Sequence, residues 1–79
     1  MNLHDPQQAK LKTALIRRNA NWLLVHDAMY SKDDLLTAKE VRESLLLKNY
    51  SWANRHECTV WRWMKDIQAI HEAYYPRER

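Results

Sequence analysis

The chain contains no glycine, and its two prolines, Pro6 and Pro76, lie near the two ends of the sequence. Glycine and proline are the residues that most strongly interrupt regular structure, and tight β-hairpin turns usually need Gly or an Asn-Gly pair. The residues between the two prolines therefore lack the turn residues of a β-sheet. This feature predicts an all-α protein that is helical almost throughout.

A chain of 79 residues forms one domain at most, and its 46% apolar and 29% charged residues are typical of a globular fold. A core this small supplies about 3–5 kcal/mol of net stability, so a second copy or another partner often completes it. We expect a flexible N-terminal arm at 1–6, a single domain at 7–75 and a short tail at 76–79.

Several classes of protein are disfavoured by simple features. Cys58 is the only cysteine, so the chain cannot form an internal disulfide. The first residues are polar and form no signal peptide, and no apolar run approaches the roughly 18 residues of a membrane span. We therefore expect a cytoplasmic protein that does not enter membranes. The net charge of +3 is compatible with nucleic acid but does not by itself indicate it.

Residues 7–29 show the apolar spacing of an amphipathic helix. One stripe, with spacings of three, four or seven, consists of Leu11, Leu15, Trp22, Val25 and Met29. A second stripe on the same segment consists of Ile16, Ala20, Leu23 and Leu24. Two apolar stripes need cover on two sides, which predicts a homodimer. Asn19 and Asn21 are poor helix formers, so a break into two shorter helices is the alternative.

A second helix is predicted after the polar loop at 31–34. Thr37 and Glu40 have the spacing of a capping box, in which the Thr side chain and the Glu side chain bind each other's backbone amides. The helix should extend from Ala38 to about Lys48, followed by a turn at 49–51. The residues expected to face the core are Ala38, Val41 and Leu45.

A third helix is predicted from about Asn54 to Tyr74. Asn54 and Glu57 repeat the spacing of a capping residue and a first-turn acid. Pro76 should end the helix, because the residue before a proline is disfavoured in the helical region. The residues expected to face the core are Val60, Met64 and Ile67.

Residues 36–45 and 59–67 resemble the positioning and recognition helices of small helix-turn-helix and winged-helix transcriptional regulators. Recognition helices of that family often read Thr-Val-Tyr-Arg-x-Leu-x-x-Leu, and Trp61 stands here in place of the Tyr. The resemblance covers about residues 36–70. The connection between the two helices resembles the longer ones of metal-responsive winged-helix repressors. Because 71–79 contain no glycine, the wing should be rudimentary or absent.

The resemblance implies a sequence-specific DNA-binding protein whose partner is double-stranded DNA. It would be a small transcriptional regulator or an accessory factor of a prokaryotic phage, plasmid or other mobile element. The outward side of the third helix should read bases in the major groove. Our candidates for base reading are Arg55, His56, Thr59 and Arg62. Our candidates for phosphate contacts are Lys39, Lys48, Tyr50, Ser51 and Lys65.

Trp61 and Trp63 lie about 200° apart on a helix, so both cannot face the core. The exposed one would contact a dimer partner or the DNA backbone, unless Trp52 and the tyrosines at 74–75 shield it. An alternative function follows from these rings. The chain would then be a helical adaptor or inhibitor that binds another protein through an exposed Trp and Tyr surface.

Metal binding and catalysis are both disfavoured. His56, Cys58 and His71 are ligand types for zinc, but there is no second cysteine and no closely spaced histidine pair. Cys58 is expected to be a buried or half-buried filler. Ser44 and Cys58 lack a positioned base and an oxyanion site, and Asp33 with Asp34 read as loop charges. We expect neither a cofactor nor an enzyme.

Overall fold

The computed structural model describes residues 6–30 and 36–76, and every regular element in these ranges is helical. The elements in chain order are α1 (Pro6–Arg18), α2 (Trp22–Met29), α3 (Ala38–Leu47), the short 3-10 helix η1 (Ser51–Ala53) and α4 (Glu57–Tyr74). The predicted all-α bundle is confirmed, in its four-helix form. Pro6 begins α1 instead of ending an arm, and the rest of that arm, the loop at 31–34 and residues 77–79 lie outside the described residues.

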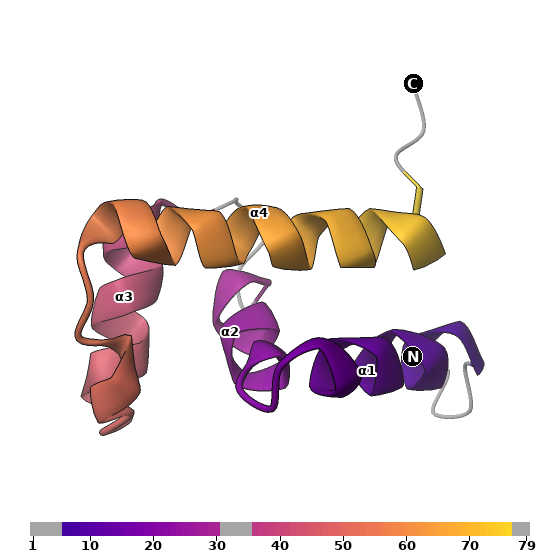
Figure 1. Ribbon diagram of the computed structural model, residues 1–79, viewed down its shortest axis with the longest axis horizontal. Coiled ribbons are helices and arrows are strands. Elements are labelled where there is room, and N and C mark those ends of the chain that lie inside the picture. Colours follow the sequence, from indigo (N-terminus) through magenta and orange to yellow (C-terminus); the bar gives the residue numbers. More distant parts are fainter. Residues whose placement is uncertain (1–5, 31–35, 77–79) are drawn as a thin grey trace.

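The longest helix, α4, extends along one side of the molecule (Figure 1). α1 lies along the opposite side and runs in the reverse direction, α2 lies between them, and α3 crosses the N-terminal end of α4. Hydrogen bonds fix the antiparallel pair at two points. Gln7 Nε2 donates to the Tyr74 carbonyl (3.2 Å), and Arg18 Nε donates to Asp66 Oδ2 (3.1 Å). The last turn of α4 is therefore held against the first turn of α1.

The predicted single helix over 7–29 is wrong, and the alternative of two helices is correct. The chain leaves the helix at Asn19, whose Oδ1 accepts a hydrogen bond from the Asn21 amide (2.9 Å). The Asn19 carbonyl accepts from the Trp22 amide (3.0 Å), which starts α2. Asparagine side chains offer the backbone such local partners, and these bonds compete with continuous helix.

The capping box at the start of α3 is confirmed. Thr37 Oγ1 accepts from the Glu40 amide (3.2 Å), and Glu40 Oε1 accepts from the Thr37 amide (3.0 Å). These two bonds satisfy amides that the first turn of a helix leaves without a helical partner. The start of α3 is therefore defined locally, by two residues that are three positions apart.

Replacing Thr37 by alanine should lower the free energy of unfolding by about 0.5–2 kcal/mol, because the Glu40 amide then loses its partner. Thermal unfolding followed by circular dichroism measures the change. The Thr37→Ser variant keeps the accepting hydroxyl and should unfold close to the parent. Equal melting temperatures for Thr37→Ala and the parent would contradict the role of the cap.

The connection from α3 to α4 begins with a left-handed residue. Asn49 has φ 66°, its amide donates to the Leu46 carbonyl, and the Tyr50 amide donates to the Leu45 carbonyl. This is the hydrogen-bond pattern of a Schellman motif, and asparagine tolerates the left-handed conformation better than most residues. The predicted turn after α3 is therefore present.

The predicted start of the last helix near Asn54 is wrong by three residues. Asn54 instead ends η1, where its amide donates to the Ser51 carbonyl (3.0 Å). His56 is the capping residue of α4, and its Nδ1 accepts from the Cys58 amide (3.2 Å). The exposed imidazole of His56 thus caps α4, whereas the sequence pattern predicted that Asn54 would be the cap.

One apolar core joins all four helices and η1. Its buried members are Leu11, Leu15, Trp22, Val25, Ala28, Met29, Val41, Leu45, Ala53, Val60, Met64 and Ile67. The first predicted stripe of residues 11–29 is buried in full, and so is the predicted inward face of α4. Of the second stripe, Ile16 and Ala20 are exposed, whereas Leu23 and Leu24 are half-buried.

The described residues contain neither a strand nor a helix that is long and apolar enough to cross a membrane. Residues 71–74, where a wing would begin, form the last turn of α4, and Pro76 follows it. Among the described residues that follow Ile70, none forms the hairpin of a wing.

Candidate nucleic-acid interface

The orientation of α4 is fixed by its buried side. Val60 and Ile67 are fully buried and Met64 almost so, while Arg62 and Lys65 are exposed on the other side of the helix. Residues that are three or four positions apart share one face of a helix, so this alternation defines an inward and an outward side. We call the exposed residues Cys58, Trp61, Arg62, Lys65 and Ala69 the outward face of α4.

The four candidates for base reading do not all lie on this face. Arg62 lies at its centre, whereas Thr59 is half-buried one turn earlier. Arg55 and His56 are exposed but precede the helix, because α4 begins at Glu57. The helical spacing that grouped all four residues therefore does not apply to Arg55 and His56. They flank the N-terminus of α4, which is still the end that helix-turn-helix proteins direct toward DNA.

Arg42 holds the segment before α4 in place, and sequence reasoning missed this role. Its Nε donates to the Arg55 carbonyl (2.7 Å), and its Nη2 donates to Asn54 Oδ1 (2.9 Å). A planar guanidinium suits such a double contact. In the sequence, this role of Arg42 is indicated only by its position directly after the buried Val41.

The five candidates for phosphate contact divide into two groups. Lys65 lines a pocket of about 360 Å³ together with Thr37 and Ala38, so the start of α3 lies beside the middle of α4. Lys39 is exposed in that same first turn of α3. The first turn of α3, which contains Lys39, therefore lies beside the part of α4 that contains Lys65.

The other group lies at the far end of α3. Lys48 ends that helix, and its Nζ is 4.0 Å from Asp27 Oδ2 on α2. Tyr50 is half-buried and stacks on Trp52, with ring centroids 5.6 Å apart, and Ser51 is exposed at the start of η1. Figure 1 shows this end of α3 pointing away from α4. Lys48, Tyr50 and Ser51 are thus separated from the outward face.

The two neighbouring tryptophans of α4 have different surroundings. Trp63 is half-buried between Trp22 and Trp52, with ring centroids 5.9 and 6.0 Å away. Trp61 is 53% exposed, and Lys65 Nζ lies 5.2 Å from its ring centroid, a cation–π distance. Trp63 belongs to the fold, and Trp61 belongs to the outward face.

Asp66 on α4 forms hydrogen bonds with two other helices of the protein. Its Oδ2 accepts from Trp22 Nε1 (2.7 Å) and from Arg18 Nε (3.1 Å). The hydrogen bond from Trp22, followed by the bond and the charge of Arg18, holds the pKa of Asp66 below its usual value. The carboxylate therefore fastens α1 and α2 to α4 and does not reduce the positive charge of the outward face.

Two histidines face each other between α2 and α4. His26 Nε2 lies 2.9 Å from His71 Nδ1, and Tyr30 stacks on His71 with an interplanar angle of 13°. Burial, followed by the nearby His71, lowers the pKa of His26 to about 4. Burial also lowers the pKa of His71. Both rings are therefore neutral at pH 7 and serve as packing groups.

The predicted place of Cys58 is wrong. This free cysteine is exposed in the first turn of α4, because position 58 lies on the opposite side of the helix from the buried Val60 and Ile67. His71 lies near the other end of α4 against His26, far from His56 and Cys58. Within residues 6–30 and 36–76, no three histidine, cysteine or acidic side chains gather in a way that could hold a metal ion.

Comparison of the chain with protein-family models, curated proteins and solved structures found no match. What the molecule does must therefore be inferred from its own side chains. The outward face of α4 combines two exposed cations with one exposed aromatic ring, on a helix whose register the core fixes. Such a surface can bind a polyanion and contact flat groups.

Proposed function

We propose that this protein binds double-stranded DNA in a sequence-specific manner, with the first half of α4 in the major groove. The observation that carries the proposal is Arg62. It is exposed at the centre of the outward face and pairs with no carboxylate of the described residues. An arginine with a free guanidinium can pair bidentately with guanine, the commonest specific contact in the major groove.

The surroundings of Arg62 support the same proposal. Lys65 lies on the same face, and Lys39 lies in the first turn of α3, close to the pocket that Lys65 lines. Contacts from lysines to phosphates set the position of a protein on the duplex, while contacts to base edges set the sequence preference. Arg42 fixes the segment that leads into α4, and with it the N-terminal end of the helix that would contact the bases.

We propose further that the protein acts as a small transcriptional regulator or as an accessory DNA-binding factor. The predicted homodimer stays a prediction. It gains support from Ile16, which is 49% exposed on α1 and would be covered by a second copy. A symmetric dimer would place two copies of α4 on half-sites about one helical turn apart.

The test is selection of binding sites from a pool of random duplexes, followed by titration of the selected site. Replacing Arg62 by alanine should weaken binding to this site by about 1–3 kcal/mol and relax the preference at one base position. The fold should survive, because Arg62 is exposed. Circular dichroism checks the fold, and gel-shift titration measures the affinity.

The matched control is Lys48→Ala, at the end of α3 that points away from α4. This variant should keep the base preference of the parent, whatever its effect on overall affinity. If Arg62→Ala kept both the affinity and the base preference of the parent, the outward face of α4 would not be the reading surface. A parent that enriched no sequence from the pool would contradict sequence-specific binding.

A second candidate function is supported by Trp61, whose ring is 53% exposed although tryptophan is normally buried. Exposed aromatic rings often dominate protein–protein contacts, so the chain would then be an adaptor or inhibitor. The dependence of binding affinity on salt concentration distinguishes the two functions. Binding to phosphates weakens steeply between 50 and 200 mM salt, whereas a contact centred on tryptophan does not.

A further inference from the structure

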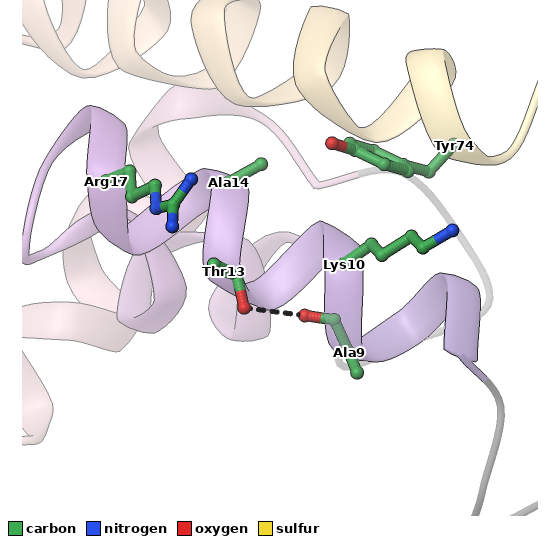
Figure 2. Close-up of a pocket in the computed structure, with 6 residues that line it drawn as sticks. All are labelled: Ala9, Lys10, Thr13, Ala14, Arg17 and Tyr74. Carbon is green, nitrogen blue, oxygen red and sulfur yellow. Dashed lines mark hydrogen bonds between the residues drawn. The ribbon is translucent and has the colours of Figure 1, made fainter.

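A second basic surface lies on α1, away from the outward face of α4. A shallow pocket of about 400 Å³ lies on α1 beside the end of α4. We call it the α1 groove, and its lining residues are Ala9, Lys10, Thr13, Ala14, Arg17 and Tyr74. Figure 2 shows Arg17 at one end of the groove and Lys10 at the other, with the Tyr74 ring beside Lys10.

The charge of α1 has one sign. Between Pro6 and Arg18 the helix contains four cations and no acidic residue. Arg18 is paired with Asp66, but Lys10 and Arg17 pair with no carboxylate in the part of the chain that the structure describes. Two unpaired cations at the two ends of one groove attract an anion that is at least as long as the groove.

The shape of the groove suits an extended polyanion. Lys10 and Arg17 are seven positions apart, which is about 10.5 Å along a helix axis. A duplex strand carries one phosphate per about 3.4 Å of its axis, so both cations can reach phosphates of one strand. The small side chains of Ala9 and Ala14 let a backbone approach closely between them. The groove is held together because Gln7 Nε2 bonds to the Tyr74 carbonyl (3.2 Å).

The α1 groove and the outward face of α4 lie on two helices that are linked to each other. Tyr74 is about 18 Å from Arg62 along α4, at 1.5 Å per residue. The pair of Arg18 and Asp66 links the end of α1 to α4 between these two points. Both surfaces therefore belong to one pair of linked helices.

We propose that the α1 groove binds the phosphate backbone of the duplex whose major groove α4 contacts. This inference rests on the proposed function and assigns Lys10 and Arg17, which that function does not use, to a separate backbone contact. DNA fits better than an acidic peptide, because the distance of about 10.5 Å between Lys10 and Arg17 along the helix axis is close to three phosphate spacings of one strand. The contact adds affinity without base preference.

The experiment measures the dissociation constant for a random duplex at several salt concentrations. Each lost phosphate contact lowers the slope of log K against log salt by about 0.9. We expect a decrease of about 0.9 for Lys10→Gln and of about 1.8 for the double variant Lys10→Gln, Arg17→Gln. The base preference at the selected site should not change. Lys12→Gln is the matched control, because Lys12 is also exposed on α1 but lines a different pocket, next to Asp27.

Three outcomes would overturn the assignment. The first is an unchanged slope in the double variant, and the second is an equal decrease in Lys12→Gln, which would reflect net charge alone. The third is tighter binding of poly-glutamate than of duplex, lost in the double variant, which would make the groove a site for acidic peptides. Arg62→Ala in the same series separates the two proposals. If it relaxes base preference while the double variant keeps the parent slope, only the α1 groove fails, whereas a parent that binds no duplex overturns both.

Discussion

Replacing Leu45 by alanine should lower the free energy of unfolding by about 2–5 kcal/mol, the range for a fully buried leucine. Leu45 has no exposed surface and packs in the core that joins α3 to α4. A core of this size supplies about 3–5 kcal/mol, so the variant should be largely unfolded or close to it at 25 °C. Urea unfolding followed by tryptophan fluorescence measures the change.

The matched control is two residues away. Leu47 lies in the same helix as Leu45 but is 84% exposed, so Leu47→Ala should change stability by less than about 0.5 kcal/mol. Both variants make the same side-chain change in one helix, so most of the difference between them reports burial. If Leu45→Ala gives no measurable transition, Leu45→Met, which conserves volume, should cost less than about 1.5 kcal/mol. Equal effects at 45 and 47 would contradict the packing of α3.

Acidification from pH 7 to pH 4 should destabilise the fold through His26. Its pKa is 6.5 in the unfolded chain and about 4 in the folded protein, so between these values the unfolded state binds more protons. Stability is therefore complete above about pH 6.5 and decreases as the pH falls toward 4. Because the ring is only half-buried and solvent screens part of the effect, we expect a loss of about 1–2 kcal/mol.

The other charged and titratable groups near His26 act in both directions, and the lowering of the pKa prevails. His71 on α4 also has a lowered pKa and adds to the loss, and Lys12 on α1 opposes protonation of His26. Asp27 and Glu72 act in the opposite direction, on His26 and His71 respectively, without reversing the shifts.

The measurement for this prediction is the urea midpoint at a series of pH values from 7.5 to 4. Asp66, whose pKa is lowered from 3.8, adds its own loss only as the pH approaches that value or falls below it. The variant His26→Gln should therefore flatten the profile between pH 6.5 and 4. A parent whose urea midpoint stayed constant over that window would contradict the neutral histidine pair.

Local signals in the sequence predicted a large part of this fold. The capping box of Thr37 and Glu40 places the start of α3, because both partners lie within one turn of the same helix. The apolar spacing of Val60, Met64 and Ile67 predicts the buried side of α4 and hence the outward position of Arg62. Patterns of this kind depend on helix geometry alone, so they need no knowledge of the neighbouring helices.

Predictions that depended on competing local bonds were less successful. Asn54 has the spacing of a helix cap, but η1 uses its amide, and the imidazole of His56 caps α4 instead. This shift of three residues left Arg55 and His56 ahead of the helix. The sequence alone does not show whether Asn54 or His56 caps α4, because the answer depends on the path of the connection before the helix. Arg42 fixes that path through hydrogen bonds to residues 12 and 13 positions away.

The sequence alone determined that the chain is helical and which stripe of each helix is apolar, because the absence of glycine and the spacing of apolar residues are properties of short segments. The tertiary structure decided what lies between helices. Trp22 and Arg18 meet Asp66 across more than forty positions, His26 meets His71, and Trp63 rather than Trp61 packs against the core. The α1 groove also depends on the tertiary structure, because Tyr74 and Lys10 line it together only when α1 and α4 lie antiparallel. Contacts between distant segments depend on how whole helices pack, and no local pattern specifies that.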